Sequence, residues 1–267
     1  MPNEYFDAGE QRAFKVRALF ERIASRYDLL NDLQSFGFHR HWKRRVRKSA
    51  RPERGERSLD ICCGTGDLTL GFARQGLQAI GLDFSEGMLD MAHKRKKKFL
   101  QLGQASHAGS EGVCGTAKLS TQSRPPRLEF IRGDAQCIPF RDACFEIVTV
   151  GYGLRNLSSW ETGLSEMCRV ATPGGRLIVL DFGKPGNPVW RTLYFSYLRL
   201  LVPLLGLLFC GSASAYAYIL ESLKHYPAQR GVAAKMRDLG LVNVQIIDLL
   251  GGAMSINYAE KSKEAKT

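Results

Sequence analysis

Short apolar runs alternate with helical patterns between residues 58 and 182, and this alternation constrains the fold more than any other feature of the sequence. The runs have lengths typical of buried strands and occupy residues 58–62, 78–84, 128–134, 145–152 and 176–182. The helical patterns lie between them, at residues 68–75, 85–100 and 157–170. Strands that alternate with helices form βαβ units with parallel strands. The sequence therefore predicts an α/β domain around a mostly parallel sheet.

The sequence predicts a helical cap at the N-terminus and a helical lid inserted late in the domain. Residues 1–57 have helical patterns and carry six of the twelve net positive charges, so we expect a basic N-terminal helical cap. The domain itself is expected over residues 58–267, with an apolar helical lid at 187–227. Two late strand-like runs, 242–249 and 253–259, are separated by glycines and suit an antiparallel hairpin.

One segment interrupts the alternation. Residues 101–126 are rich in Gly, Ser, Ala, Gln and Thr and contain few large apolar side chains. Such a composition is typical of surface segments that do not pack into a core. We therefore expect a flexible insertion between the second helix and the third strand of this region.

A glycine-rich turn follows the first strand, and its residues are Asp60, Gly64, Thr65, Gly66 and Asp67. Such a turn lets a ligand approach the backbone closely, and its N–H groups usually attract an anion. A nicotinamide or flavin dinucleotide is one alternative, but Thr69 stands where that fingerprint has its third glycine. Asp67 would also repel a pyrophosphate at the helix N-terminus. S-adenosylmethionine, which has no phosphate and carries two cationic centres, is the cofactor that this turn favours.

Four more positions near the ends of later strands complete a nucleoside site. Asp83 ends the second strand, where an acidic residue hydrogen-bonds a ribose diol in nucleoside-binding α/β folds. Met88 falls on the first turn of the next helix, where it can cover one face of adenine, and Asp134-Ala135 can meet the exocyclic amine of that base. These residues belong to neighbouring strand ends, which is where open α/β sheets bind ligands.

The ordered set of motifs resembles one family, the ubiquinone/menaquinone biosynthesis C-methyltransferases, which are class I S-adenosylmethionine-dependent enzymes. The matching segments are 20–32, 59–68, 81–89, 151–157, 173–177, 180–185 and 251–253. The most specific parts are Arg26-Tyr27-Asp28 and Gly153-Leu154-Arg155-Asn156. The resemblance implies a Rossmann-like class I fold, with a seven-stranded, mostly parallel sheet and an antiparallel last strand. It also implies cofactor contacts at Thr65, Asp83, Asp134, Ala135 and Gly151.

The resemblance implies methylation of a ring carbon of a prenylated quinol, and this chemistry needs the loss of a proton from a neighbouring hydroxyl. Arg155 is always charged and is a poor base, but it can stabilise a phenolate or hold a water molecule. Asn156 can orient the same hydroxyl, and Tyr27 and Asp28 can close the pocket. The alternatives are that Arg155 only pairs with a nearby carboxylate and that Asp28 only caps a helix.

Charge and apolar patterning suggest the partners. The net charge of +12 and the apolar run at 193–210 favour peripheral contact with an anionic membrane surface, with a spanning helix or an ordinary core helix as the alternatives. A second substrate alternative is another apolar small molecule. A nucleic-acid-binding protein is not expected, because the chain lacks a recognisable motif for it. A homodimer is a further expectation.

We expect no metal binding or catalysis from the histidine and cysteine residues. The five His have no metal-binding spacing, and we take His39 and His41 to lie in a solvated basic run, so no metal is expected. Cys62 and Cys63 are adjacent and are expected to pack as small side chains beside the cofactor. The scattered cysteines and the acidic, polar start of the chain lead us to expect a cytoplasmic protein.

Overall fold

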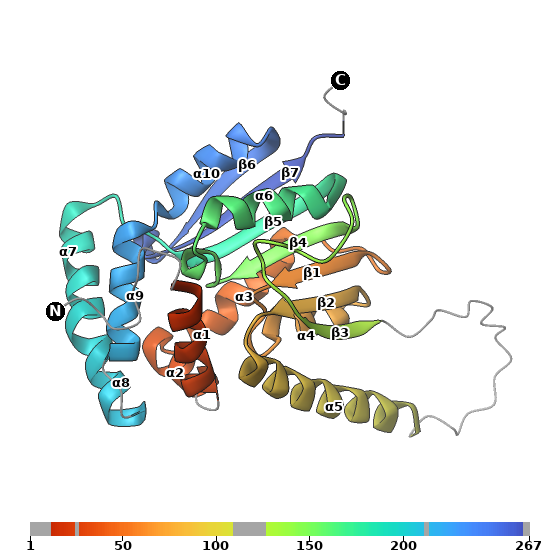
Figure 1. The fold of residues 1–267 in the computed structure, drawn as a ribbon, viewed down its shortest axis with the longest axis horizontal. Coiled ribbons are helices and arrows are strands. Elements are labelled where there is room, and N and C mark those ends of the chain that lie inside the picture. Colours follow the sequence, from red (N-terminus) through yellow and green to blue (C-terminus); the bar gives the residue numbers. More distant parts are fainter. Residues whose placement is uncertain (1–11, 25–26, 109–126, 211–213, 264–267) are drawn as a thin grey trace, which may run out of the picture.

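The computed structural model describes residues 12–24, 27–108, 127–210 and 214–263 (Figure 1). Its centre is a seven-stranded sheet in the order β3-β2-β1-β4-β5-β7-β6. The strands are β1 (Arg57–Ile61), β2 (Gln78–Asp83), β3 (Leu128–Arg132), β4 (Phe145–Gly151), β5 (Ala171–Phe182), β6 (Leu241–Leu249) and β7 (Met254–Lys261). Within β1 to β5 neighbouring strands pair in parallel, whereas β7 is antiparallel to both β5 and β6. The predicted fold class, including the antiparallel last strand, is confirmed.

Helices cover both faces of this sheet because each helix buries one apolar face against it. One face packs against α3 (Phe38–Ser49), α4 (Asp67–Ala73) and α5 (Glu86–Ala108). The other packs against α6 (Trp160–Val170) and α10 (Ala228–Asp238). The two cores therefore share the central strands, whose side chains alternate between them.

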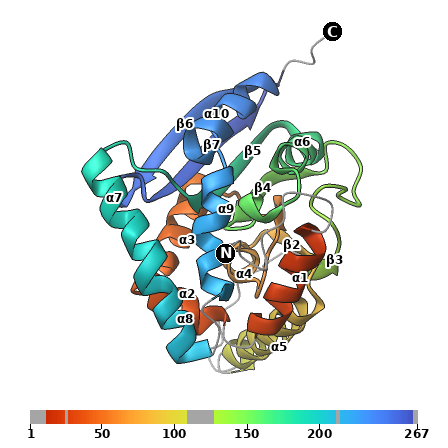
Figure 2. The same ribbon diagram turned by 60° about the vertical axis from the view of Figure 1, so that its left-hand side comes forward.

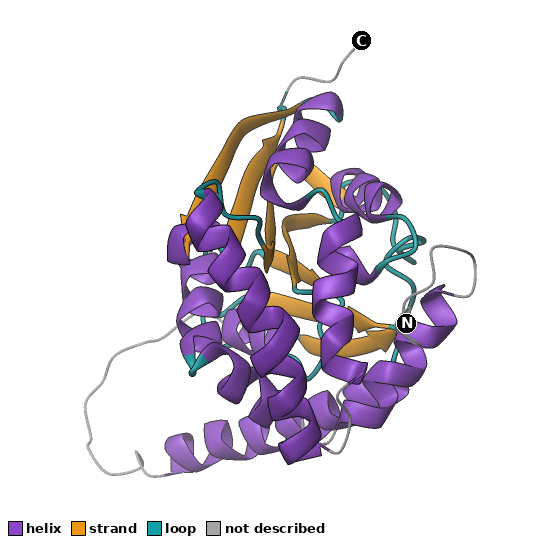
Figure 3. Ribbon diagram, turned by 90° about the vertical axis from the view of Figure 1, so that its left-hand side faces the viewer, coloured by secondary structure: helices purple, strands orange, loops and turns teal. Residues whose placement is uncertain are grey.

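The cap and the lid lie together at the carboxyl ends of the parallel strands, as Figures 1 and 2 show. The cap begins with α1 (Arg12–Ile23) and α2 (Tyr27–Ser35), and α3 then leads into β1. The lid consists of α7 (Pro188–Ser196), a π-helical turn η3 (Tyr197–Leu201), α8 (Val202–Cys210) and α9 (Ser214–His225). Helix α2 packs against α8, and α8 packs against α9. Figure 3 shows these helices in front of the sheet.

The expected flexible insertion at 101–126 is wrong for its first part. Helix α5 continues to Ala108, eight residues beyond the end that the sequence pattern indicated. Small and polar residues such as Gln and Ala are compatible with a helix interior, so composition alone did not mark the end of the helix. Residues 109–126 lie outside the described residues.

A buried carboxylate lies in the middle of the sheet. Asp60 on β1 accepts hydrogen bonds from the hydroxyls of Thr69 and Thr149, both at 2.9 Å, and is 2% exposed. Burial disfavours its charged form and raises the pKa of Asp60 to about 6, although the two hydroxyls oppose this shift. The native state therefore binds a proton more tightly at Asp60 than the unfolded chain does.

This shift predicts a pH dependence of stability that Asp60→Asn removes. Between about pH 4 and 6 the folded protein binds more protons at Asp60 than the unfolded chain, so stability falls as pH rises through this range, by roughly 3 kcal/mol. Urea unfolding of the wild type and the variant from pH 4 to 7 measures it. The free-energy difference between them should change across this range, and Asp238→Asn, at an exposed position, is the control variant. A constant difference for Asp60→Asn would contradict the assignment.

Candidate active site

A cavity of about 130 Å³ opens at the carboxyl ends of the central parallel strands. Six of the residues expected to bind the cofactor line it: Gly64, Asp83, Met88, Asp134, Ala135 and Gly151. They come from the loop after β1, the end of β2, the start of α5, the loop after β3 and the end of β4. Cys62 also lines the cavity, where the sequence placed a small packed side chain.

Asp83 is held rigidly at the wall of this cofactor cavity. The backbone N–H of Gly64 donates to Oδ2 at 2.8 Å, and the N–H of Ser85 donates to Oδ1 at 2.9 Å. Burial raises the pKa of Asp83, and these two N–H groups oppose that shift. Each carboxylate oxygen retains a further lone pair for a ligand hydroxyl. The position and the free acceptor capacity of Asp83 fit a ribose diol.

The other three expected cofactor residues, Asp60, Thr65 and Gly66, lie in the glycine-rich turn or in the strand beneath it. Asp60 lies beneath it in the sheet, as described above. The Thr65 hydroxyl donates to Asp28 Oδ1 at 2.9 Å and accepts from Arg95 at 2.8 Å. Gly66 has φ of 83°, and a Cβ there would meet the Phe130 ring at 2.5 Å, so only glycine fits. These residues do not line the cofactor cavity and position the ones that do.

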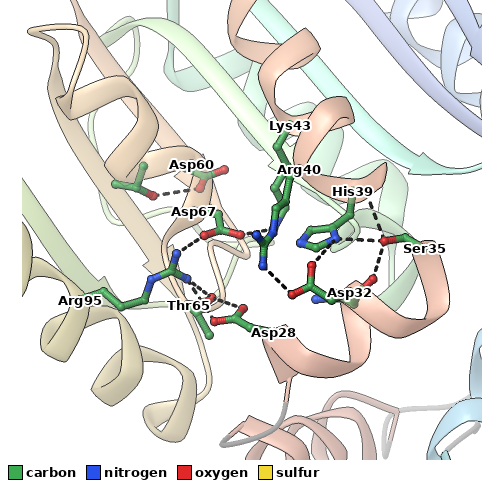
Figure 4. A network of polar contacts seen from close by, with 12 residues as sticks. Asp28, Asp32, Ser35, His39, Arg40, Lys43, Asp60, Thr65, Asp67 and Arg95 are labelled. Carbon is green, nitrogen blue, oxygen red and sulfur yellow. Dashed lines mark hydrogen bonds and ion pairs between the residues drawn. The ribbon is translucent and has the colours of Figure 1, made fainter. Parts of the chain in front are cut away.

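The negative charge of Asp67 pairs with two cations, whereas the sequence predicted that it faces the bound ligand. Its carboxylate binds Lys43 of α3 at 2.6 Å and also binds Arg95 of α5 (Figure 4). Burial alone would raise the pKa of Asp67, but the two cations hold it well below its usual range. Asp67 does not line the cofactor cavity. It joins the cap to the glycine turn, and the carboxylates that face the cofactor cavity belong to Asp83 and Asp134.

A second cavity, of about 450 Å³, lies between the cap and the lid. Its walls are mainly apolar and aromatic side chains from α2, α3, α7, η3 and the ends of β5 and β7; they include Phe38, Trp42, Phe182, Leu193, Tyr194 and Leu198. Tyr152 lines both this apolar cavity and the cofactor cavity. A non-polar molecule in the second cavity would therefore border the cofactor at Tyr152.

The backbone at Tyr152 is strained and firmly held. Its φ of 66° is unfavourable for a bulky residue. The carbonyl oxygen accepts hydrogen bonds from Arg155 Nη1 at 2.5 Å and from Asn156 Nδ2 at 3.1 Å. The next residue, Gly153, has space for no side chain, since a Cβ would lie 2.3 Å from that of Cys62. The strand end that separates the two cavities is thus fixed from several directions.

Arg155 and Asn156 differ in whether their side chains line a cavity. Arg155 is buried, pairs with Asp181 at 2.8 Å, and lies over the Phe182 ring with 4.5 Å between guanidinium carbon and ring centroid. It lines neither cavity, so the structure has the arrangement that we weighed as the alternative, a pairing with a nearby carboxylate. Asn156 does line the cofactor cavity, and its buried Oδ1 has no hydrogen-bond partner among the described residues.

The two expected closing residues lie on α2. Tyr27 begins this helix, but its side chain lies outside the described part of the structure. Asp28 lies in the first turn and contacts Thr65 and also Arg95, at 3.3 Å. It therefore fastens the cap to the glycine turn, as Figure 4 shows.

Sequence reasoning missed several residues of both cavities. Val16 and Phe20 of α1 line the cofactor cavity; Val16 lies outside the matching segments, and Phe20 begins the segment 20–32 but was given no role. The expectation that His39 is solvated is wrong, since it is 5% exposed and lines the apolar cavity. The apolar residues Trp42 and Val46 on the same helix are the signal that could have shown a buried face within the basic run.

Comparison with known proteins now identifies the family. A model of the ubiE/COQ5 methyltransferase family matches residues 6–106 and 110–261. The chain belongs to this family. The predicted resemblance is confirmed, and so are a methyltransferase activity and S-adenosylmethionine as the cofactor.

Individual relatives of this methyltransferase agree along almost their whole length. The demethylmenaquinone methyltransferase of Desulfitobacterium hafniense is 36% identical, over 96% of this chain and 93% of its own. The ubiquinone/menaquinone biosynthesis C-methyltransferase UbiE of Francisella tularensis subsp. novicida is 33% identical, over 94% and 93%. Among solved structures, a SAM-dependent methyltransferase of Thermotoga maritima has a TM-score of 0.57 at 18% identity and covers 92% of this chain and 99% of its own. This last likeness shows the fold alone.

The geometry predicts that Asp83 is needed for cofactor affinity. Asp83→Ala removes an acceptor that is buried and held by two backbone N–H groups, so S-adenosylmethionine should bind about 10- to 150-fold more weakly. Titration calorimetry measures this affinity, and Asp90→Ala, at an exposed position of α5, is the matched control. Unchanged affinity in a folded Asp83 variant would exclude it from the binding site.

Proposed function

We propose that this methyltransferase transfers a methyl group from S-adenosylmethionine to a ring carbon of a prenylated quinol, such as a demethylmenaquinol or the related benzoquinol. The observation that carries the proposal is the position of Tyr152 in the walls of both cavities. One cavity has carboxylates for a nucleoside and the other has mainly apolar walls for a prenyl group. The names of the two relatives, which are quinone-pathway methyltransferases, support this substrate class.

The residues of the cofactor cavity have distinct roles in this proposal. Asp83 would hold the ribose, Met88 would cover the adenine, and Asp134 with Ala135 would meet its edge. When bound there, S-adenosylmethionine supplies an electrophilic methyl group. Asn156 lines the same cavity and has a buried acceptor without a partner among the described residues, so we propose that it receives a ligand N–H or O–H group. The chain thus contributes alignment, which is the main requirement of an in-line transfer.

Arg155 acts as a positioning residue in this proposal. Its guanidinium holds the Tyr152 carbonyl, and Asp181 compensates its charge. It therefore fixes the wall between the two cavities without touching substrate. Asp28 has a similar role for the cap, because it connects α2 with the glycine turn. Tyr27 stays a prediction as a closing residue.

A direct assay tests the proposed reaction. We expect the purified protein to methylate a demethylmenaquinol with a short prenyl tail, kept reduced and dissolved in detergent, in the presence of S-adenosylmethionine. Mass spectrometry should show the gain of one methyl group on the ring carbon. The alternative substrate class, another apolar small molecule, is favoured if quinols with naphthalene and benzene rings both remain unmethylated while the cofactor binds.

We further propose that the outer face of the lid lies on an anionic membrane surface. The helix Pro188–Leu208 is long and apolar enough to cross a membrane by length and composition. Its two faces differ, however: Tyr194, Leu198 and Val202 are buried over the protein, whereas Leu200 and Leu208 are 69% and 68% exposed. A helix with one face on the protein and one apolar face outward suits a position in the membrane plane. This places the apolar cavity close to a lipid-borne substrate.

Vesicle binding tests this contact. Binding should require an anionic lipid and should weaken with salt, because exposed charges are screened within about 10 Å at 0.1 M. Leu200→Glu/Leu208→Glu should weaken co-sedimentation with phosphatidylglycerol-containing vesicles by about tenfold or more, because two leucines lose their burial in lipid. Val242→Glu changes an exposed apolar residue of β6 and is the control. Equal binding of the lid variant and the wild type would contradict the proposal.

The remaining partner expectations stay predictions. Peripheral membrane association follows from the proposed lid contact, and the cytoplasmic location stays a prediction. Light scattering of the purified chain decides between a monomer and the expected homodimer.

A further inference from the structure

A single imidazole lies among the apolar walls of the second cavity. His39 belongs to the first turn of α3, is 5% exposed, and lines this cavity together with Tyr152. Lys43, one helical turn further along α3, brings its ammonium to 5.9 Å from the centroid of the Tyr152 ring. His39 therefore borders the same space as the wall that adjoins the cofactor.

The hydrogen bonds around His39 determine its tautomer. The Ser35 hydroxyl donates its only proton to the Asn31 carbonyl at 2.5 Å, so it must accept from its other neighbours. One of these is His39 Nδ1 at 3.0 Å, which therefore carries a proton. Asp32 Oδ1, 3.6 Å from the same nitrogen, favours this arrangement (Figure 4). Nε2 consequently has the lone pair, and it makes no hydrogen bond to a described residue.

Burial, together with two nearby positive charges, favours the neutral form of the ring. Burial lowers the pKa of His39, and the positive charges of Lys43 and Arg40 lower it further. Asp32 and Asp67 oppose the shift, but Asp32 also binds Arg40 at 2.5 Å, and Asp67 binds Lys43 and Arg95. Two tyrosines of this cavity, Tyr194 and Tyr197, are less suited to accept a proton, since burial raises their pKa and favours their protonated forms.

We propose that Nε2 of His39 is the general base that removes the hydroxyl proton of the quinol. This inference rests on the proposed function. The O–H bond breaks, an N–H bond forms at Nε2, and the oxygen electron pair is delocalised to the neighbouring ring carbon. That carbon forms a bond to the methyl group as the C–S bond breaks and its electrons stay on sulfur. The ring-carbon proton then moves to oxygen, the aromatic ring is restored, and Nε2 returns its proton to solvent.

The alternative is that His39 only joins α2 to α3 through Ser35. An asparagine separates the two roles, because its amide can occupy the place of Nδ1–H but has no basic nitrogen. His39→Asn should therefore fold and bind S-adenosylmethionine like the wild type. Its single-turnover methylation of a detergent-dissolved quinol at pH 7 should be slower by about 10²- to 10⁴-fold, the usual contribution of a general base. His41→Asn, at an exposed position two residues along the helix, should leave the rate unchanged.

Two further measurements test the role of His39 independently of the size of the rate loss. The rate of the wild type should be level above the pKa of His39 and should fall at lower pH, whereas the residual rate of His39→Asn should keep rising with pH as the quinol ionises. In ¹⁵N-histidine spectra of the wild type without ligands, the signal that His39→Asn removes should be that of a neutral ring with Nδ1 protonated. This second measurement does not depend on activity.

The outcomes separate the two proposals. Methylation by the wild type together with equal rates and pH profiles for His39→Asn would overturn the role of His39 and leave the proposed function standing. No methylation of any quinol by a cofactor-binding wild type would overturn both. If the variant does not fold, a wild-type rate that does not fall at low pH while the protein stays folded, or a wild-type spectrum without a neutral ring protonated at Nδ1, overturns the role of His39.

Discussion

The buried ion pair of Arg155 and Asp181 fixes the ends of β4 and β5, and both cavities are built against these strand ends. Arg155 holds the Tyr152 carbonyl in a backbone conformation that costs about 1 to 3 kcal/mol in isolation. Asp181 also accepts the backbone N–H of Arg155 at 3.2 Å and that of Phe182 at 2.8 Å. Two charges removed from water are costly unless they pair with each other and with further hydrogen-bonding groups, as these do. The buried ion pair therefore stabilises the strained backbone of Tyr152, the residue that lines both cavities.

This arrangement lets one chain bind two unlike molecules side by side. The cofactor cavity has fixed carboxylates and backbone groups, whereas the neighbouring cavity has mainly apolar walls. The ion pairs of Asp67 with Lys43 and Arg95 join the cap to the glycine turn, so the cap that covers the apolar cavity is coupled to the loop that borders the cofactor. Chemistry at the shared wall then needs a base and alignment more than a strong nucleophile from the protein.

The sequence predicted the sheet, its seven strands and most of the cofactor cavity, because strand ends and glycine turns are local patterns. It could not predict how buried charges pair across the fold. Arg155 was expected at the substrate, but its partner Asp181 is 26 residues away and only the parallel pairing of β4 and β5 brings them together. His39 lies in a basic run that suggested a solvated helix, although Trp42 and Val46 mark a buried face of the same helix.

The proposed reaction requires the quinol ring to lie at the wall shared by the two cavities. A crystal structure with S-adenosylhomocysteine and a non-reactive quinone analogue carrying a short prenyl tail would locate the ring. We expect the ring beside Tyr152, one ring oxygen within hydrogen-bond distance of His39 Nε2, and the tail between the cap and the lid. A ring bound elsewhere, with the apolar cavity filled by side chains, would rule out this binding mode.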